Sequence, residues 1–293
     1  MNFKNATKDL DLKSNDRLYI KKKSPFAPKH YKNLKPKGFK IFTFRSGFKK
    51  NNDDLLIIIF DTYVNVACKY SLTSMPSAPI VWDKKNNTNE CKALIVNSGN
   101  ANAYTGKQGL KNINKYANSL AKYLNCSIKN ILVSSTGVIG EQLDPNKISK
   151  KIKLLPISND KKLVDAAKAI STTDTFAKTS IYNLKIGNKN IRIYGFAKGS
   201  GMISPNMGTM LAYIFIDCAI SSKLLRKLLS DNIQDTFNSI TVDSDTSTSD
   251  TVMLFSNPQK EINLKKNYHK ISFTLNKLMK DLAMKIITDG EGI

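Results

Sequence analysis

The strongest chemical signal in this sequence is a threonine in a glycine-rich loop. The segment KGSGMISPNMGTML, residues 198–211, carries little charge and presents Thr209 directly before an apolar run. A threonine at the N-terminus of a chain has its own general base, because an α-amino group titrates at about pH 7.7–8.0. Thr209 reaches that state only if the bond between Gly208 and Thr209 is cut.

Self-cleavage at this bond is one hypothesis, and an ordinary turn before a strand is the other. The hydroxyl of Thr209 could attack the carbonyl carbon of Gly208 and form an ester that water then hydrolyses. Gly208 has no side chain to hinder the attack and tolerates a strained backbone. Glycine-rich turns are common, however, so these residues alone favour the turn. The sequence offers few residues for a histidine-based catalytic triad or metal site, because His30 and His269 are its only histidines.

Alternating strands and helices are expected to position this loop. Apolar runs predict strands within 54–60, 91–106, 130–140, 190–203, 210–220 and 252–256. Apolar residues at helical spacing predict helices within 113–124, 161–170, 224–237 and 275–287. This mixture favours an α/β or α+β layered fold. Several elements lead into loops of Ser, Thr and Gly, and such loops commonly carry catalytic groups.

Length and composition predict a globular cytoplasmic protein. A chain of 293 residues with 41% hydrophobic residues can bury a large core in one or two domains. The first residues contain no apolar signal segment, and no apolar run is long enough to span a bilayer. The cysteines form no C-x-x-C pair, which fits reduced thiols better than a disulfide or zinc framework: Cys68, Cys91, Cys126 and Cys218.

The net charge of +23 suggests a nucleic-acid-binding module as an alternative function. Only four of the 46 basic residues are arginine, the residue best suited to bidentate contacts with bases and phosphates. Residues 1–50 hold 13 lysines and two arginines against three aspartates, which is about half of the excess charge. We therefore expect a basic, partly extended lead-in over residues 1–50 and no nucleic-acid or membrane partner.

Six motifs occur in one order along the chain. They are NSGNANAYTG (97–106), SSTGVIG (134–140), STTDT (171–175), KGSGMISPNMGTML (198–211), FNSITVDSDTSTSDTVM (237–253) and DGEG (289–292). In this order and spacing the sequence resembles the bifunctional ornithine acetyltransferase / N-acetylglutamate synthase family of arginine biosynthesis, from about residue 25 to the end. The resemblance implies an α/β layered sandwich that cleaves itself and uses an N-terminal nucleophile.

The resemblance also implies roles for the catalytic residues. Cleavage between Gly208 and Thr209 would give an α chain, 1–208, and a β chain, 209–293, which stay together as an α2β2 heterotetramer. Thr209 would then be the nucleophile, with its freed amine as the general base. Thr136 and Gly137 would form the oxyanion hole, one through its hydroxyl and the other through its backbone N–H. The alternative for Thr136 is a plain turn residue.

Three further residues would bind substrate if the resemblance holds. Lys198 would hold the substrate carboxylate as a compact cation. Thr172 would add a hydrogen bond, with its neighbour Thr173 as the competing candidate. Glu291 would bind the ammonium group of ornithine. The alternative for Lys198 is a solvated lysine at the end of a strand.

The implied reaction has two half-steps. Thr209 takes acetyl from N2-acetyl-L-ornithine and releases ornithine, and L-glutamate then takes the acetyl group to give N-acetyl-L-glutamate. This is covalent catalysis that needs no metal and no bound cofactor. Bifunctional members also accept acetyl-CoA, which makes acetyl-CoA a second candidate donor.

Two other enzyme classes are alternatives to this interpretation. A related N-terminal-nucleophile amidase or aminopeptidase would transfer to water instead of an amine. A strand followed by D-x-D at 239–247 is typical of aspartate-nucleophile phosphotransferases, although too few residues follow it for that domain.

The sequence departs from the family pattern in two ways. Gly208 stands where the family usually has alanine. Family members also continue well past DGEG, which implies a chain truncated at its C-terminus.

Overall fold

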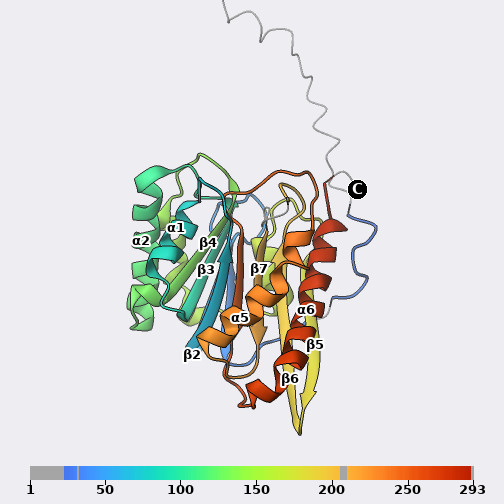
Figure 1. The fold of residues 1–293 in the computed structure, drawn as a ribbon. Helices are drawn as coiled ribbons and strands as arrows, with labels where there is room; N and C mark the ends of the chain where they lie inside the picture. The colour runs from blue at the N-terminus through green and yellow to red at the C-terminus, as the bar shows by residue number, and fades with distance from the viewer. Residues whose placement is uncertain (1–22, 32, 205–209, 292–293) are drawn as a thin grey trace, which may run out of the picture.

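A mixed eight-stranded sheet runs through the middle of the molecule (Figure 1). The computed structural model describes residues 23–31, 33–204 and 210–291. The strands are β1 (Phe39–Phe44), β2 (Leu55–Tyr70), β3 (Glu90–Asn100), β4 (Ile131–Val138), β5 (Lys178–Ile186), β6 (Lys189–Lys198), β7 (Leu211–Ile216) and β8 (Thr251–Ser256). Their order across the sheet is β4-β3-β2-β8-β7-β6-β5, and β1 pairs with β2 beside this path.

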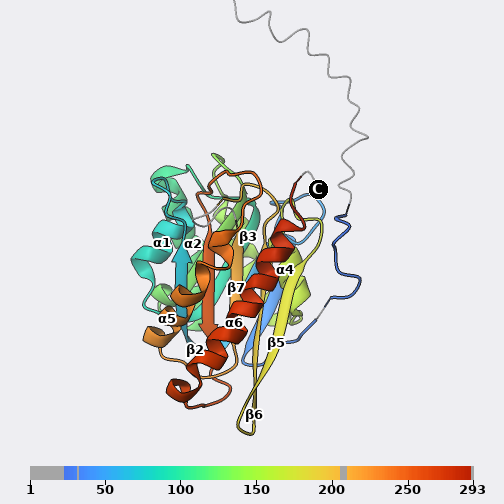
Figure 2. The same cartoon turned by 45° about the vertical axis from the view of Figure 1, so that its right-hand side comes forward.

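Helices cover both faces of this sheet. They are α1 (Ala78–Asn86), α2 (Gly106–Leu124), α3 (Pro145–Ile152), α4 (Leu163–Ile170), α5 (Ser222–Ile233) and α6 (Leu264–Ile287). In Figure 1, α5 and α6 lie in front of the sheet, with α1 and α2 toward the β3–β4 side. Figure 2 shows α4 behind the strands. This is the layered α/β architecture that the sequence predicts.

The two central strands, β7 and β8, are buried on both faces. All six residues of each strand are buried, and the two strands run parallel. Ala212 and Ile214 of β7 face α5 and α6, whereas Tyr213 and Phe215 face the side of α4. Successive side chains of a strand point to opposite faces, so a strand covered on both sides is apolar throughout. This explains the continuous apolar run that begins at residue 210.

Helix α2 shows how the local sequence sets an element boundary. Its buried residues recur at helical spacing and include Ile113, Tyr116, Ala117 and Leu120. The helix ends at Leu124, and Asn125 takes a left-handed conformation with φ of +49°, which asparagine tolerates better than most residues. The predicted end of this helix is therefore confirmed.

The basic segment over residues 1–50 contains a core strand that the sequence analysis did not identify. Strand β1 pairs antiparallel with β2, and its Phe39 ring stacks on Phe215 with centroids 4.6 Å apart. Phe39, Ile41 and Phe42 are buried. The description as a partly extended lead-in therefore does not apply to 39–44, where the lysines on either side obscured a short apolar pattern.

The segment 239–247 is not a strand, contrary to the sequence-based expectation. Phe237–Ser239 form a short 3-10 helix, and the residues from there to β8 are irregular. Asp243 of the D-x-D pair accepts hydrogen bonds from the backbone N–H groups of Met202 and Ile203. The aspartate-nucleophile alternative therefore loses the strand end on which it depended.

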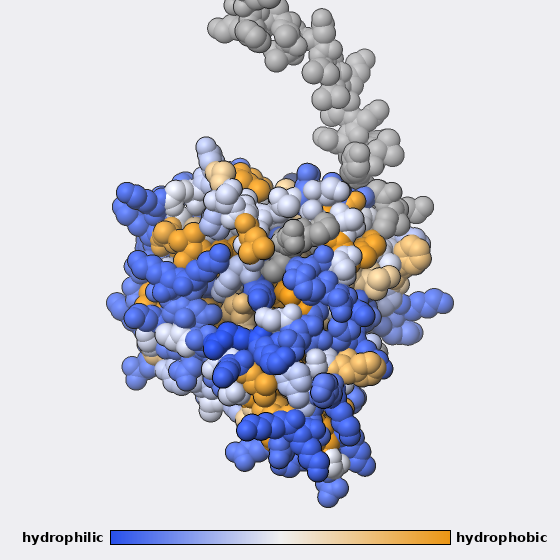
Figure 3. Space-filling model, in the orientation of Figure 1, coloured by the Kyte–Doolittle hydropathy of each residue, from blue (hydrophilic) through white to orange (hydrophobic). Residues whose placement is uncertain are grey.

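The surface differs sharply from this interior. On the face shown in Figure 3, hydrophilic residues cover most of the surface and hydrophobic ones form only scattered groups. Within the part of the chain that the structure describes, no helix is both long enough and apolar enough to cross a membrane.

Candidate active site

One cleft of about 650 Å³ gathers all of the predicted site residues that the structure describes. They are Thr136, Gly137, Thr172, Lys198 and Glu291, called the five cleft residues below. Gly208 and Thr209 lie outside the described residues. Across residues 23–31, 33–204 and 210–291, no group of three or more His, Cys, Asp and Glu side chains is arranged to hold a metal ion.

Thr136 and Gly137 lie near the end of β4, where it runs parallel to β3. Thr136 is buried, and Gly137 has φ of +130°, a conformation that favours glycine. A Cβ atom at Gly137 would overlap the backbone of Gly99 on β3. Only glycine therefore allows these two strand ends to approach so closely while the neighbouring threonine lines the cleft.

Lys198 is the last residue of β6 and is almost completely buried, with 2% of its surface exposed. Its Nζ donates a hydrogen bond to Oγ1 of Thr136 at 3.2 Å. The end of β6 thus brings a cation directly beside the hydroxyl at the end of β4. A buried ammonium group in this place favours negative charge in the cleft.

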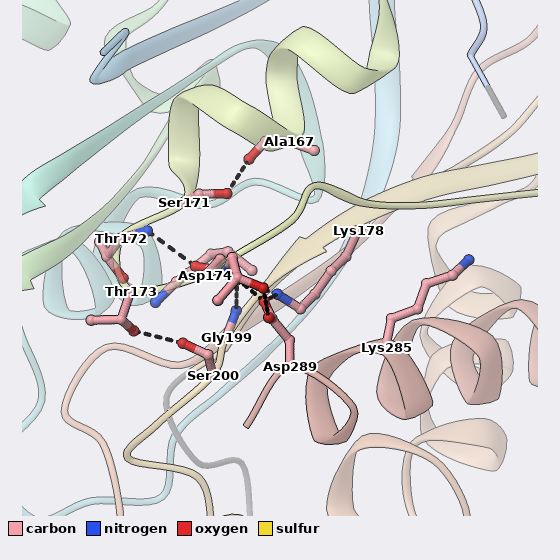
Figure 4. Close-up of polar contacts among 12 residues, drawn as sticks. Ala167, Ser171, Thr172, Thr173, Asp174, Lys178, Gly199, Ser200, Lys285 and Asp289 are labelled. Atoms are coloured by element: carbon pink, nitrogen blue, oxygen red, sulfur yellow. Dashed lines mark hydrogen bonds and ion pairs between the residues drawn. The ribbon is translucent and has the colours of Figure 1, made fainter. Parts of the chain in front are cut away.

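The two threonines after α4 differ in their hydrogen bonds. The hydroxyl of Thr173 is paired with the Ser200 hydroxyl at 2.6 Å (Figure 4). The backbone N–H of Thr172 donates to Oδ2 of Asp174 at 3.0 Å. Both threonines line the cleft, and Thr172 stays the predicted substrate contact.

A buried ion network lies beneath these residues, and the sequence analysis missed it. Lys178 Nζ is 2.6 Å from Asp174 Oδ1 and 2.5 Å from Asp289 Oδ2, and all three side chains are buried (Figure 4). Asp289 also accepts hydrogen bonds from the N–H and the hydroxyl of Thr175. The sequence did contain a sign of this network, because Asp174 lies in the motif STTDT and Asp289 lies in the motif DGEG.

This network connects the segments that carry three of the five cleft residues. Asp174 accepts the N–H of Gly199, next to Lys198, at 2.7 Å, as well as that of Thr172. Glu291 follows Asp289 by two residues, and its own N–H donates to the carbonyl of Ser200 at 2.7 Å. The buried ions therefore tie the C-terminal segment to the end of β6.

The charge of Asp174 is stabilised despite its burial. Burial alone would raise the pKa of this carboxyl group. The ammonium groups of Lys178 and Lys198, together with the N–H of Gly199, outweigh that effect and hold the pKa of Asp174 below its ordinary value. The carboxylate is therefore ionised at neutral pH and binds its partners as an anion.

Asp250 binds the backbone just after the predicted cleavage site. Its Oδ1 accepts the backbone N–H of Met210, the residue that follows Thr209, at 2.8 Å. Burial raises the pKa of this carboxyl group well above its usual value. Asp250 thus holds the start of β7 beside the start of β8.

Solved structures with this architecture include an L-aminopeptidase D-Ala-esterase/amidase from Ochrobactrum anthropi, which is a variant of the Ntn hydrolase fold. It has a TM-score of 0.50 and 9% identity, over 87% of this chain and 84% of that chain. At this identity the likeness shows the fold alone. The layered sheet therefore has the fold class of these Ntn hydrolase structures. The ArgJ family model matches residues 40–293, so the chain belongs to the ArgJ family and is an acyltransferase of arginine biosynthesis.

Curated relatives and solved family members agree with this membership. The arginine biosynthesis bifunctional proteins ArgJ of Mesorhizobium japonicum and Agrobacterium fabrum are 40% and 41% identical over 281 residues, which is 92% of this chain and 68% of theirs. The crystal structure of ArgJ from Bacillus halodurans is 32% identical, with a TM-score of 0.53, and covers 59% of this chain and 97% of that one. An ornithine acetyltransferase from Mycobacterium tuberculosis, complexed with ornithine, is 26% identical over the same shares, with a TM-score of 0.50.

Proposed function

We propose that this chain transfers the acetyl group of N2-acetyl-L-ornithine to L-glutamate through an acetyl ester on Thr209. The observation that carries the proposal is the meeting of the five cleft residues, from four separate segments, in one cleft of an ArgJ-family chain. The solved relative from Mycobacterium tuberculosis, named as an ornithine acetyltransferase in complex with ornithine, supports the choice of substrate.

The reaction would begin with self-cleavage. The hydroxyl oxygen of Thr209 attacks the carbonyl carbon of Gly208, the peptide C–N bond breaks, and the nitrogen of Thr209 becomes a free amine. Water then hydrolyses the ester, which leaves Gly208 with a carboxylate and Thr209 as a new N-terminus. This step rests on the sequence, because both residues lie outside the described part of the chain.

Acetyl transfer would then take two half-reactions. The amine of Thr209 accepts the hydroxyl proton while the oxygen attacks the acetyl carbonyl, and ornithine leaves after its nitrogen takes that proton. The amino group of glutamate next attacks the acetyl ester and releases Thr209. Neither half-reaction needs a metal or a bound cofactor, and acetyl-CoA is a second donor that fits the same acetyl ester.

The cleft residues take complementary parts in this scheme. Thr136 and Gly137 donate hydrogen bonds to the oxyanion of each tetrahedral intermediate. Lys198, 3.2 Å from the Thr136 hydroxyl, holds the α-carboxylate of the substrate. Thr172 adds a hydrogen bond to the substrate, and Glu291 pairs with the ammonium group of ornithine.

The two chains formed by cleavage are expected to stay in one assembly. Chains 1–208 and 209–293 would remain together, because β7 pairs with β6 on one side and β8 pairs with β2 on the other. A heterotetramer of two α and two β chains in the cytoplasm is the expected form, with small molecules as its only substrates.

The test of this function is the transfer kinetics of the purified protein. Initial rates at several fixed glutamate concentrations should give parallel double-reciprocal lines against acetylornithine, the pattern of a covalent intermediate. Labelled ornithine should also exchange into acetylornithine without glutamate. Acetate release that does not depend on glutamate would instead identify an amidase, the related class that transfers to water.

Replacement of Thr136 by alanine tests the oxyanion hole. The Thr136→Ala variant loses one donor to the developing oxyanion, so we expect kcat for acetyl transfer to fall by about 10²–10³-fold. The KM values should change less, and the thermal midpoint should stay close to that of the wild type. Thr136→Ser keeps a hydroxyl and is the matched control. A large loss of stability with unchanged activity per folded molecule would show that Thr136 has only a structural role.

A further inference from the structure

The cleft contains a second lysine, Lys49, from the loop between β1 and β2. It lines the cleft together with Lys198, although the two come from different parts of the chain. Its Nζ donates to the carbonyl oxygens of Ala169 and Ser171, at 3.3 and 3.0 Å. An ammonium group has three donors, so two carbonyls leave one N–H to a ligand in the cleft.

The loop that carries Lys49 is held rigidly. The carboxylate of Asp54 is fully buried and accepts the backbone N–H groups of Ser46, Gly47, Phe48 and Lys49 at 2.7–2.9 Å. The loop also packs directly on the end of β3, where a Cβ atom at Gly99 would lie only 2.6 Å from the carbonyl oxygen of Phe48. Lys49 is therefore placed by a fixed backbone, as a ligand-binding side chain requires.

Two cations in one cleft favour a ligand with two negative charges. Burial lowers the pKa of Lys49, the carboxylates of Asp54, Asp174 and Asp53 oppose that effect, and the ammonium group of Lys198 lowers the pKa further. The ammonium groups of Lys49 and Lys198 therefore repel each other, while the three carboxylates already offset part of the cost of burying Lys49. A carboxylate beside each would relieve the repulsion and compensate for the burial of both.

Acidic groups of the cleft gather elsewhere, around residues 199–203. Glu291 lies against Gly201, where an added Cβ would be 2.8 Å from its carboxylate oxygen. Asp243 is bound to the N–H groups of Met202 and Ile203. The cleft thus presents carboxylates at this loop and Lys49 at the carboxyl end of α4, which suits two substrates whose side chains carry opposite charges.

We propose that Lys49 binds the side-chain carboxylate of the acetyl acceptor and so selects a dicarboxylic amino acid in the second half-reaction. This inference rests on the proposed function and deepens it. Lys198 takes the α-carboxylate common to both substrates, and Lys49 takes the γ-carboxylate that only glutamate has. The ornithine side chain, which is cationic, lies toward Glu291.

The Lys49→Met variant tests this assignment, because methionine keeps the length of the side chain without its charge. With acetylornithine as the donor, kcat/KM for glutamate should fall by about 10–100-fold, mainly through KM, as expected for a lost charged hydrogen bond. Transfer to glutamine, which has a neutral amide in place of the carboxylate, should change by less than about threefold. The exchange of ornithine into acetylornithine, which involves no glutamate, should also stay nearly constant. Lys50→Met, at the exposed neighbouring position, is the matched control.

A structural role for Lys49 predicts a different pattern. Equal losses for glutamate and glutamine, or an exchange rate that falls as far as glutamate transfer, would overturn the assignment. Calorimetric titration of the unacetylated enzyme with L-glutamate and L-glutamine tests it without turnover. The wild type should prefer the dicarboxylate and Lys49→Met should lose that preference, whereas equal preference in both proteins would overturn the inference. Absent exchange and transfer in the wild type would contradict the proposed function, while this binding result would still decide the role of Lys49.

Discussion

The Thr209→Ala variant is expected to remain a single chain and to show no acetyl transfer. Alanine has no hydroxyl, so it can neither attack the carbonyl carbon of Gly208 nor carry the acetyl group. Intact-mass spectrometry should find one species near 32.7 kDa. The wild type should instead give two pieces, residues 1–208 and 209–293, the second beginning with Thr209.

Thr209→Ser is the control for this experiment, because serine keeps the hydroxyl and should still permit cleavage, although at a different rate. Cleavage of Thr209→Ala to the same extent as the wild type would point to a contaminating protease. It would remove the nucleophile assignment and, with it, the proposed acetyl ester. Transfer by an uncleaved wild type would contradict the role of the freed amine as general base.

The Lys178→Met variant is expected to lose about 3–5 kcal/mol of unfolding free energy. Lys178 bridges two buried carboxylates, so its removal leaves Asp174 and Asp289 without their shared cation. Equilibrium denaturation in urea measures the change. Lys227→Met is the matched control, because the Lys227–Asp231 ion pair is exposed and should contribute little.

The loss in Lys178→Met should depend on pH. The folded-state pKa of Asp174 lies below its ordinary value, so its ion pair contributes stability above the unfolded pKa of about 3.9 and loses that contribution as the pH falls through the folded pKa. In Lys178→Met the folded-state pKa of Asp174 rises. Its unpaired carboxylate then destabilises the folded state only at the higher pH values at which it is ionised. The difference between the two proteins should therefore grow from about pH 4 to pH 7. A difference independent of pH would mean that lost packing, not charge, is responsible.

The central elements were predictable because their patterns are local. Strands β7 and β8 appear as continuous apolar runs, and α2 shows helical spacing that stops at Asn125. Strand β2 was foreseen only over 54–60, whereas it extends for 16 residues. Its pairing with β3 shifts register between Ile59 and Val64, and the exposed polar residues in between hide the continuation.

The five cleft residues could be predicted as a group because the motifs that contain them resemble those of the family in order and spacing, and the structure brings them to one cleft. Their individual roles stay predictions. Lys49, Lys178 and Asp289 could not be found in the same way. Lys178 and Asp289 are 111 positions apart, and their contact exists only after the C-terminal segment docks beside β5. Lys49 is one lysine among many, and only its fixed loop distinguishes it.

The order of the strands determines whether the enzyme can refold after cleavage. Strands β7 and β8, which would belong to the second chain, lie between β2 and β6 of the first. Before the cut, unfolding is reversible in principle, because one chain holds every strand. After the cut, loss of structure releases two separate polypeptides, neither of which has a complete sheet, and recovery becomes second order in chain concentration. In dilute solution the cleaved protein would therefore stay folded only because it unfolds slowly. The apparent midpoint of its thermal unfolding should depend on the heating rate, whereas that of Thr209→Ala should not.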